Sequence, residues 1–538
     1  MSRTIADAST VSLAGQRSPV GGGWISPRLD GPFLLVVLVV ALLARLPMLS
    51  LVPRFTDETL EVLHSLRIVR EGLLPLTNYD SYYGSLYNYL VALAFVVSGE
   101  HPLAPRFLIM WAGCLTVAVT YFLGRDLCVA VLPVTSAIAA RVVGAVAAAL
   151  LAMNAVHIVV SSHVAWSNCL TPLLTTVGLW LILRGHLPLA GLTFGLALQT
   201  HPLVIAILPG AGVYALSQVV RGRAWWPAAL GAGLFLVGYA NVIAHNLGTG
   251  GDSLATASRI RAEYGADQSA TSGYAPTLSA MLVLLVRALS GAADQRASTL
   301  WYLADPWGIA VALLAIAGVA LSVRRREWLI AAAVLIFLAV MPAANPKFRT
   351  LLTARYLMPV VPALLAVAVC GGFWFWHWLR PRLGVTPVSR AWMAVVLLAG
   401  GMETGSLVRY YQRTIERTDT NERILGLADL AARTIQAGEI VLIDDSIGAE
   451  LPDTGVTELR GVEYLLTVAR LPYRAIRVTA GRLQDELRTA PSALAVLNAR
   501  DAAQVADRLT VVALDLRPPA ETGRMSDFRL YRISRARG

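Results

Sequence analysis

The sequence predicts a mainly α-helical, polytopic membrane protein with a small α/β domain at its C-terminus. Three observations support this fold class. The 538 residues are 56% hydrophobic and only 15% charged, which is far more apolar than an ordinary soluble protein. Many stretches approach the roughly 20 apolar residues that a helix needs to cross a bilayer. After about residue 411, short apolar runs alternate with amphipathic segments, a pattern typical of α/β domains.

The positive charge of the chain is a topology signal. The net charge of +11 comes almost entirely from arginine, since lysine occurs once, at Lys347. These arginines stand mainly in short loops, and cytoplasmic loops of membrane proteins are enriched in them. We therefore expect membrane lipids, and no nucleic acid, as partners. The four cysteines lie in or beside apolar segments without a CxxC spacing, which indicates core residues rather than a disulfide framework.

The chain divides into three parts. Residues 1–30 are polar and lack a cleavable signal pattern, which predicts a disordered cytoplasmic tail. Residues 31–410 hold the long apolar segments and form the transmembrane domain. Residues 411–538 are less apolar and form the C-terminal α/β domain.

About eleven segments of the transmembrane domain are candidate spans. Two more apolar stretches, 83–98 and 277–291, are interpreted as interfacial helices, because the loop arginines then all fall on one side. This threading puts the N-terminus in the cytoplasm and the α/β domain outside the cell, with the protein in the plasma membrane. The spans are 32–52, 104–124, 139–160, 167–184, 188–200, 203–219, 225–246, 302–323, 328–344, 355–378 and 390–409.

Helices and strands are expected to alternate along the α/β domain. A charged amphipathic helix is expected over 411–436. Apolar runs at 440–443, 475–478, 493–497 and 511–514 predict strands, and helical patterns lie between them at 459–470, 480–488 and 499–508. Such alternation favours a partly parallel sheet.

Asp57 and Glu58 follow the first apolar segment directly. Two adjacent carboxylates at a membrane boundary are costly unless they face water, a cavity or a partner, so they are functional candidates. A helix-capping role is equally reasonable for Glu58. For Asp57 we favour chemistry. With the predicted threading, Asp57 and the polar loops that carry Ser161–Asn168, His201 and Asn345–Arg355 all emerge on the outer face.

The order of these motifs resembles the GT-C glycosyltransferases, in the branch of protein O-mannosyltransferases and bacterial aminoarabinose and arabinose transferases. The resemblance covers roughly residues 30–380. It rests on the Asp57-Glu58 pair, Gly72 and Pro75, Tyr87-Asn88-Tyr89-Leu90, Arg106, Leu123-Gly124-Arg125, the Ser162–Asn168 loop, Gly191 to Leu198, and Ala354 to Pro362.

The resemblance implies transfer of a sugar from a polyprenyl-phosphate donor to an acceptor hydroxyl on the outer face, with inversion at the sugar carbon. Asp57 would act as general base. The acceptor would be a lipid, a glycan or a protein. Cations would meet the leaving phosphate, and the expected ones are Lys347, Arg349 and Arg355, with Tyr356 beside them.

Further candidates for substrate contact surround these residues. Many relatives carry an acidic residue where this chain has Asn168, so any second acid must be Glu58 or Asp80. Asn168 is kept as a hydrogen-bonding candidate. The remaining expected contacts are Asp80, Tyr82, Tyr83, His163 and His201. The histidines have no HxxH or HExxH spacing, so no metal ligands are predicted; a divalent metal would be compatible with the chemistry, but nothing in the sequence supports a cofactor.

Two other classes of protein are alternatives. A transporter or lipid flippase would show two related halves and polar or Gly/Pro-interrupted residues at mid-span, whereas these spans are mostly clean Ala, Leu and Val. A non-catalytic scaffold would depend on residues 411–538 and would tolerate loss of the Asp57 carboxylate.

Overall fold

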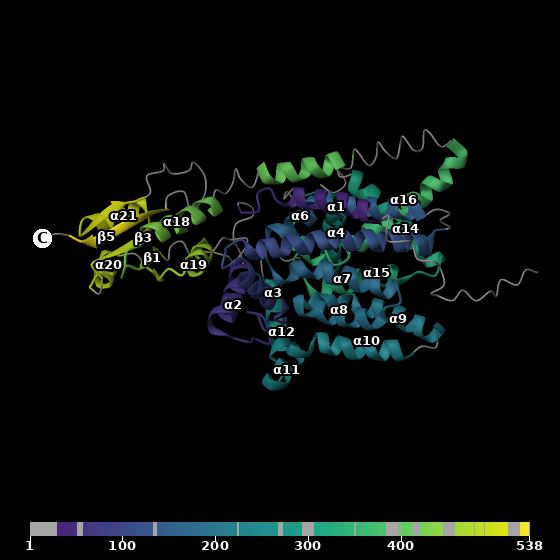
Figure 1. Cartoon of the computed structure of the whole chain (residues 1–538), viewed down its shortest axis with the longest axis horizontal. Helices are drawn as coiled ribbons and strands as arrows, with labels where there is room; N and C mark the ends of the chain where they lie inside the picture. The colour runs from purple at the N-terminus through teal and green to yellow at the C-terminus, as the bar shows by residue number, and fades with distance from the viewer. Residues whose placement is uncertain are drawn as a thin grey trace, which may run out of the picture.

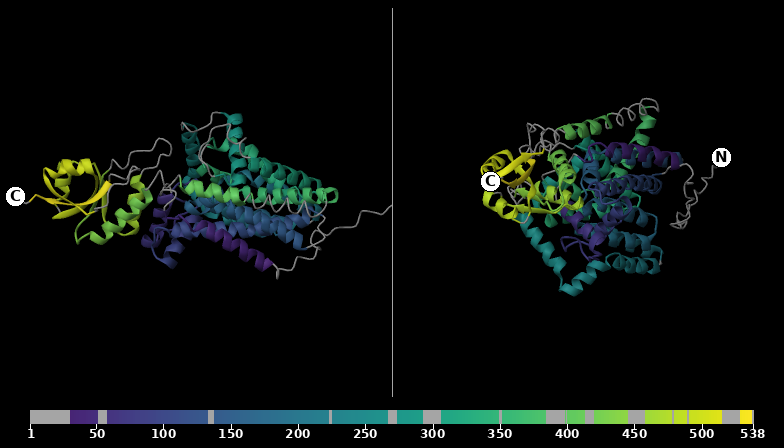
Figure 2. Two further views of the ribbon diagram at one scale, coloured as in Figure 1. Left: turned by 90° about the horizontal axis from the view of Figure 1, so that it is seen from above. Right: turned by 60° about the vertical axis from the view of Figure 1, so that its left-hand side comes forward.

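The computed structural model is a long helical bundle with the α/β domain at one end (Figure 1). It describes residues 30–50, 58–132, 137–222, 225–266, 273–292, 306–348, 351–383, 398, 400–412, 420–444, 458–477, 479–488, 490–514 and 528–536. Asp57, Arg349 and the predicted tail over residues 1–29 lie outside these ranges. Two views turned from the first keep the domain at the same end of the bundle (Figure 2). We call this end of the bundle the domain side and the opposite end the far side.

The described part of the bundle includes the helices α1 to α16, a helix over residues 400–412 and several short 3-10 or π segments. The first eight are α1 (Asp30–Arg45), α2 (Glu58–Glu71), α3 (Leu86–Ser98), α4 (Ala104–Val131), α5 (Ala137–Met153), α6 (Ala155–Ile158), α7 (Thr171–Leu183) and α8 (Leu187–Thr200). The others are α9 (Leu208–Gly222), α10 (Trp225–Gly238), α11 (Ala240–Thr249), α12 (Asp252–Ala266), α13 (Tyr274–Ser290), α14 (Pro306–Arg324), α15 (Leu329–Ala344) and α16 (Val361–Leu383).

The structure supports a membrane protein but gives a smaller number of clear spans than the sequence predicted. Among the described residues, 3 helices are long and apolar enough to cross a bilayer, or up to 5 if each of two bent pairs is one span. Several further apolar helices are only 10–17 residues long. The count of about eleven spans therefore stays a prediction, as do the sides on which the termini lie.

Two predicted spans are bent rather than straight. The segment 139–160 turns by 63° between α5 and α6, where the Asn154 side chain accepts a hydrogen bond from the His157 backbone N–H and caps a new helix. The segment 225–246 turns by 60° between α10 and α11. There the Gln199 amide donates to the carbonyl oxygen of Gly238 at 2.5 Å, which offers this carbonyl a partner outside its own helix.

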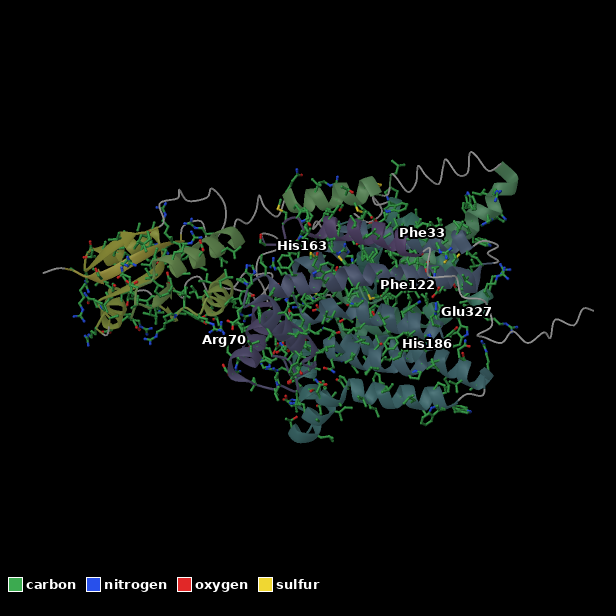
Figure 3. The ribbon with its side chains drawn as sticks, in the orientation of Figure 1. Phe33, Arg70, Phe122, His163, His186 and Glu327 are labelled. Atoms are coloured by element: carbon green, nitrogen blue, oxygen red, sulfur yellow. The ribbon has the colours of Figure 1, made fainter. Side chains whose placement is uncertain are left out.

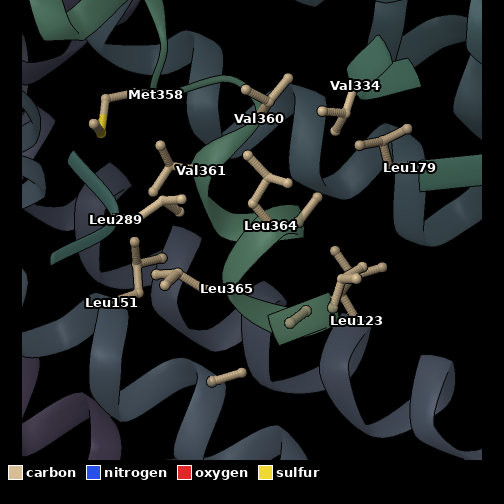
Figure 4. Close-up of a cluster of buried hydrophobic side chains, with 14 of the residues drawn as sticks. Leu123, Leu151, Leu179, Leu289, Val334, Met358, Val360, Val361, Leu364 and Leu365 are labelled. Carbon is tan, nitrogen blue, oxygen red and sulfur yellow. The ribbon is translucent and has the colours of Figure 1, made fainter. Parts of the chain in front are cut away.

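Close packing of small and aliphatic residues holds the bundle together. Buried Leu and Val side chains from α4, α5, α7, α13, α15 and α16, with Met358 and Val360 just before α16, interlock in its centre (Figure 4). Gly191 on α8 lies so close to Gly231 on α10 that an added Cβ would come within 2.0 Å of the Gly231 carbonyl oxygen. Contacts of this kind drive helix association in lipid, where burial of apolar surface gives no net gain.

Buried ion pairs connect the helices at the far side. The Asp30 carboxylate pairs with Arg125 at 2.5 Å and with Arg141 at 3.0 Å. Asp126 joins Arg125 to Arg184. Figure 3 shows His186 and Glu327 at this same end, opposite His163 and Arg70. These arginines were all predicted to share one side of the membrane, and the structure gathers them in one place.

The C-terminal region contains the predicted α/β domain. Its helices are α18 (Thr420–Thr434), α19 (Glu458–Val468), α20 (Ala480–Glu486) and α21 (Ala499–Ala506). Its strands are β1 (Val441–Asp444), β2 (Tyr473–Ile476), β3 (Ser492–Asn498), β4 (Leu509–Ala513) and β5 (Phe528–Arg535), in the order β2-β1-β3-β5-β4. β1 pairs in parallel with β2 and β3, as expected, whereas β5 is antiparallel to both β3 and β4.

The α/β domain packs directly on the domain side of the bundle. α19 lies against α2, and the Tyr464 hydroxyl donates to the carbonyl of Pro102 at 2.7 Å. Glu100, just before α4, accepts hydrogen bonds from Arg70 at 2.5 Å and from Arg470 at 2.7 Å. A single apolar core runs from α2, α3 and α4 into β1, β3 and α19. The two parts therefore meet through a continuous interface beside α2.

Candidate functional site

The site is built around the N-terminal part of α2, at the domain side. Glu58 and Glu61 occupy the first turn of this helix, where the unpaired backbone N–H groups and the helix dipole favour negative charge. Both side chains are buried. Ionised carboxylates in such a place require hydrogen-bond donors, and the structure supplies donors to each of them from loops far away in the sequence.

Glu58 is held by a buried ion pair. The Arg106 guanidinium on α4 donates to its carboxylate at 2.5 and 3.3 Å, and the Ala165 backbone N–H donates at 2.8 Å. Arg106 also donates to the carbonyl of Leu49 at 2.8 Å. Leu49 precedes and Glu58 follows the segment that contains Asp57, so Arg106 fixes the chain on both sides of it. These bonds favour a positioning role for Glu58.

Two loops donate hydrogen bonds to the carboxylate of Glu61. Its carboxylate accepts hydrogen bonds from Asn78 and from the Tyr83 hydroxyl, each at 3.1 Å. It also accepts from the backbone N–H of Ser167 at 2.8 Å. Burial raises the pKa of Glu61 to about 7, although the bonds from Ser167, Asn78 and Tyr83 lower it. The pKa of Tyr83 is raised by burial and by the neighbouring Glu61 charge.

Four rings form an aromatic cluster next to these carboxylates. Tyr82 and Tyr83 meet edge to face with their ring centroids 4.4 Å apart. The His201 ring stacks on Tyr83 at 6.4 Å and lies 5.5 Å from the ring of Tyr356. Burial, followed by the positive charge of Arg355, lowers the pKa of His201, so its ring is neutral near pH 7. Tyr82 and His201 are half-buried, whereas Tyr83 and Tyr356 are buried.

Arg355 places a positively charged side chain beside the aromatic cluster. Its guanidinium carbon lies 3.9 Å from the ring centroid of Trp166 and 4.8 Å from that of Tyr356. Arg355 also donates to the Tyr356 hydroxyl at 2.9 Å. Stacking on two rings restricts the planar guanidinium without neutralising it. The adjacent Trp166 indole N–H is buried and has no hydrogen-bond partner among the described residues.

One short loop connects the two halves of this site. The backbone N–H of Ala165 binds Glu58, and that of Ser167 binds Glu61. The residue between them, Trp166, lies under Arg355. The loop Ala165–Ser167 therefore holds the carboxylates of α2 and the Arg355 cation in one arrangement.

The remaining predicted residues lie at different distances from this arrangement. His163 bonds the carbonyl of Pro47 at 2.9 Å and the Tyr411 hydroxyl at 3.0 Å, so it links two parts of the scaffold. Asn168 is buried, and its side-chain oxygen accepts from the thiol of Cys169 at 3.7 Å. Asp80 and Lys347 are half-buried. Arg349 and Asp57 lie outside the described residues, and the roles predicted for all of these residues stay predictions.

Comparison with solved structures shows the fold of the chain. No protein-family model matches the chain, and no curated protein sequence does. Among solved structures, the chain is similar to ArnT from Cupriavidus metallidurans bound to undecaprenyl phosphate, with a TM-score of 0.55 and 14% sequence identity over 95% of this chain and 98% of that one. The apo state of the same protein gives a TM-score of 0.54 at 13% identity. The chain has the GT-C fold. The oligosaccharyltransferase from Archaeoglobus fulgidus gives a TM-score of 0.47 at 13% identity over 91% of this chain and 70% of that one.

Sequence analysis thus predicted the GT-C fold and several members of the clustered site, but it missed Glu61. Tyr82, Tyr83, His201, Arg355 and Tyr356 do come together. Glu61 follows Glu58 by three positions, a spacing that brings two side chains onto one face of a helix, and this was the available signal. Among the described residues, no three His, Cys, Asp or Glu side chains gather as metal ligands.

Proposed function

We propose that this protein is a membrane glycosyltransferase that moves a sugar from a polyprenyl-phosphate donor to an acceptor hydroxyl. The observation that carries the proposal is the loop Ala165–Ser167, which binds the α2 carboxylates with its N–H groups and carries Trp166 under Arg355. This loop joins the acidic and the cationic sides of one site. The similarity to ArnT, whose solved structure is bound to undecaprenyl phosphate, supports a lipid-phosphate donor.

Asp57 is the proposed general base. An acceptor hydroxyl has to lose its proton as it attacks the sugar carbon, and a positioned carboxylate can take that proton. Attack from the face opposite the phosphate inverts the configuration of this carbon. Glu58 cannot serve equally well, because its carboxylate already accepts from Arg106 and Ala165. Its proposed task, together with Arg106, is to hold the Asp57 segment in place.

Arg355 is the proposed partner of the leaving phosphate. As the bond to the sugar breaks, negative charge grows on the phosphate, and a fixed guanidinium stabilises this charge. The indole N–H of Trp166, which has no hydrogen-bond partner in the described part of the chain, is a second donor beside it, and a buried donor of this kind calls for an oxygen acceptor. A phosphate offers such acceptors to both groups.

The half-buried rings of the aromatic cluster suit a sugar. Tyr82 and His201 present partly accessible faces next to Arg355 and Tyr356. Aromatic faces contact the apolar C–H surfaces of sugars, and hydroxyl and imidazole groups bind sugar hydroxyls. We propose that the reaction takes place on the outer face of the plasma membrane, where the α/β domain would also lie.

The proposal is tested with the purified full-length protein in lipid nanodiscs. A panel of undecaprenyl-phosphate hexoses and pentoses is added together with lipid, glycan and peptide acceptors that carry hydroxyl groups, and released undecaprenyl phosphate is measured by mass spectrometry. We expect release from at least one donor and binding of undecaprenyl phosphate itself. A wild-type protein that neither binds this lipid nor turns over any donor would refute the function.

A further inference from the structure

Glu61 is a buried group that the proposed reaction does not yet use. Its side chain is only 6% exposed, and four donor groups surround its carboxylate. Oε2 accepts from the Asn78 amide at 3.1 Å and from the Ser167 N–H at 2.8 Å. Oε1 accepts from the Tyr83 hydroxyl at 3.1 Å and from the Ser167 hydroxyl at 3.5 Å. All four groups donate to one acceptor.

These donors come from the two loops that form the walls of the site. Asn78 and Tyr83 belong to the loop between α2 and α3, and Tyr83 stacks on His201 with centroids 6.4 Å apart. Ser167 directly follows Trp166, whose ring carries Arg355 at 3.9 Å. Glu61 is therefore hydrogen-bonded to both loops. Through Tyr83 it contacts the aromatic cluster, and through Ser167 it holds the residue next to Trp166, on which Arg355 stacks.

We infer that Glu61 is a positioning residue of this site, whose carboxylate holds the Tyr83 loop and the Trp166 loop in the arrangement that receives the donor. The inference rests on the proposed function. Glu61 touches no reacting atom in this scheme. It acts through Tyr83 and Trp166, and small displacements of such groups lower rates strongly.

The arrangement depends on the charge of Glu61. An ionised carboxylate only accepts hydrogen bonds, whereas a protonated one carries an O–H that must itself donate. Protonation therefore removes one of the four acceptor positions, and the bond there breaks or, at the Tyr83 or Ser167 hydroxyl, reverses its direction. Because burial raises the pKa of Glu61 to about 7, this change falls near neutral pH. α2 lies between the first and second predicted spans, outside the membrane-crossing segments.

Several titratable groups near Glu61 keep their charge state in this range. Burial raises the pKa values of Tyr83 and Tyr87. His201 has a lowered pKa and stays neutral on both sides of pH 7. One turn away, Glu58 is paired with Arg106. The groups that face this part of α2 are Tyr83, Asp80, Tyr87, Cys169, Arg106 and Tyr464.

The test compares Glu61→Gln with wild type in the nanodisc assay, using the undecaprenyl-phosphate sugar that wild type turns over. Glutamine has nearly the same shape, and its oxygen can accept from Asn78 and the Ser167 N–H. Its NH₂ group then faces the hydroxyls of Tyr83 and Ser167, whose bonds must reverse direction and lose the carboxylate charge. We expect kcat to fall about 10- to 100-fold at pH 8, with a smaller change in KM. Wild-type kcat should fall as pH decreases through about 7. We call this falling part of the pH–rate profile the limb, and the variant should lack it.

A second variant separates positioning from simple loss of folding. The bond from Asn78 lowers the pKa of Glu61, so Asn78→Ala should move the wild-type limb to higher pH. Glu71→Gln, at the exposed end of the same helix, is the matched control and should retain both rate and profile.

The outcomes are distinct. A Glu61→Gln protein with wild-type kcat and an unchanged pH limb overturns the inference and leaves the function intact. A uniform loss of rate with the limb retained also overturns it, because the titrating group would then be another residue. A wild type that neither binds undecaprenyl phosphate nor turns over any donor refutes the proposed function, and the inference falls with it.

Discussion

Arg106 on α4 and Glu58 on α2 form an ion pair whose side chains are 1% and 3% exposed. Arg106 also binds the carbonyl of Leu49, so one guanidinium links the chain before and after the Asp57 segment. Buried pairs of this kind gain little over an apolar contact, but they are costly to break, because the partner left behind stays charged and unpaired. We interpret this pair as the anchor of the segment.

The first prediction concerns the stability of this anchor. Glu58→Gln or Arg106→Met leaves a buried charge without its partner, so each should lower the free energy of unfolding by about 3–5 kcal/mol. The double variant should lose less than the sum, because neither charge remains. Thermal unfolding in detergent measures the effect. Single variants as stable as wild type would show that the pair is not the anchor.

The second prediction concerns the phosphate partners. Trp166→Phe keeps a ring under Arg355 but removes the indole N–H, so affinity for undecaprenyl phosphate should fall about tenfold, as expected for loss of one hydrogen bond to a charged group. Arg355→Lys removes the planar, stacked cation and should reduce affinity at least as much. Native mass spectrometry measures binding. Trp226→Phe, at an exposed tryptophan, is the control; equal affinities in all variants would contradict the assignment.

The third prediction concerns the contact between the α/β domain and the bundle. Hydrogen bonds from Arg470 and Arg70 lower the pKa of Glu100 to about 2 from the usual 4.5. A lowered carboxylate pKa stabilises the docked form above about pH 4.5, and this contribution is lost as pH falls towards 2. Because Arg470 is largely exposed, water screens the pair and the contribution is small.

Hydrogen exchange of α19 as a function of pH tests this contact. The protection factor of α19, which is the intrinsic exchange rate at each pH divided by the observed rate, should fall in wild type as the pH falls below 4.5. Glu100→Gln should already have a lower protection factor at pH 7 and should show less dependence on pH. If α19 exchanges equally in both proteins at every pH, Glu100 does not stabilise the contact between the α/β domain and the bundle.

The fourth prediction concerns topology. All four native cysteines are buried, so an introduced cysteine can be labelled selectively. Asp485→Cys, on the exposed surface of the α/β domain, should react with an impermeant thiol reagent added to intact cells. His186→Cys, on the far side, should react only after permeabilisation. The reverse result would invert the threading and put the proposed site in the cytoplasm.

The sequence predicted the elements better than their contacts. The four apolar runs of the α/β domain became β1 to β4, whereas β5 was missed because an arginine stands at every third position of it, at 529, 532 and 535. This spacing leaves neither a continuous apolar run nor the period-two alternation that marks a half-buried strand. The bends after Met153 and Gly238 depend on the side-chain bonds of Asn154 and Gln199, and the partner of Gln199 is remote in sequence.

The same limit applies to the site. Aromatic and cationic residues of the outer loops could be named, because such residues are conspicuous between apolar spans. Glu61 could not be singled out, since its importance arises from Asn78, Tyr83 and Ser167, which approach it only in the folded chain. Glu58 was a candidate base by sequence, and only its bonds to Arg106 favour the structural role.

The most direct test of the central claim is the rate of sugar transfer by Asp57→Asn. The variant keeps the size of the side chain but cannot accept the proton of an attacking hydroxyl. In nanodiscs with the undecaprenyl-phosphate sugar that wild type uses, we predict loss of turnover by about 100-fold or more, with binding of undecaprenyl phosphate unchanged. Turnover at the wild-type rate would contradict the assignment of Asp57 as the general base.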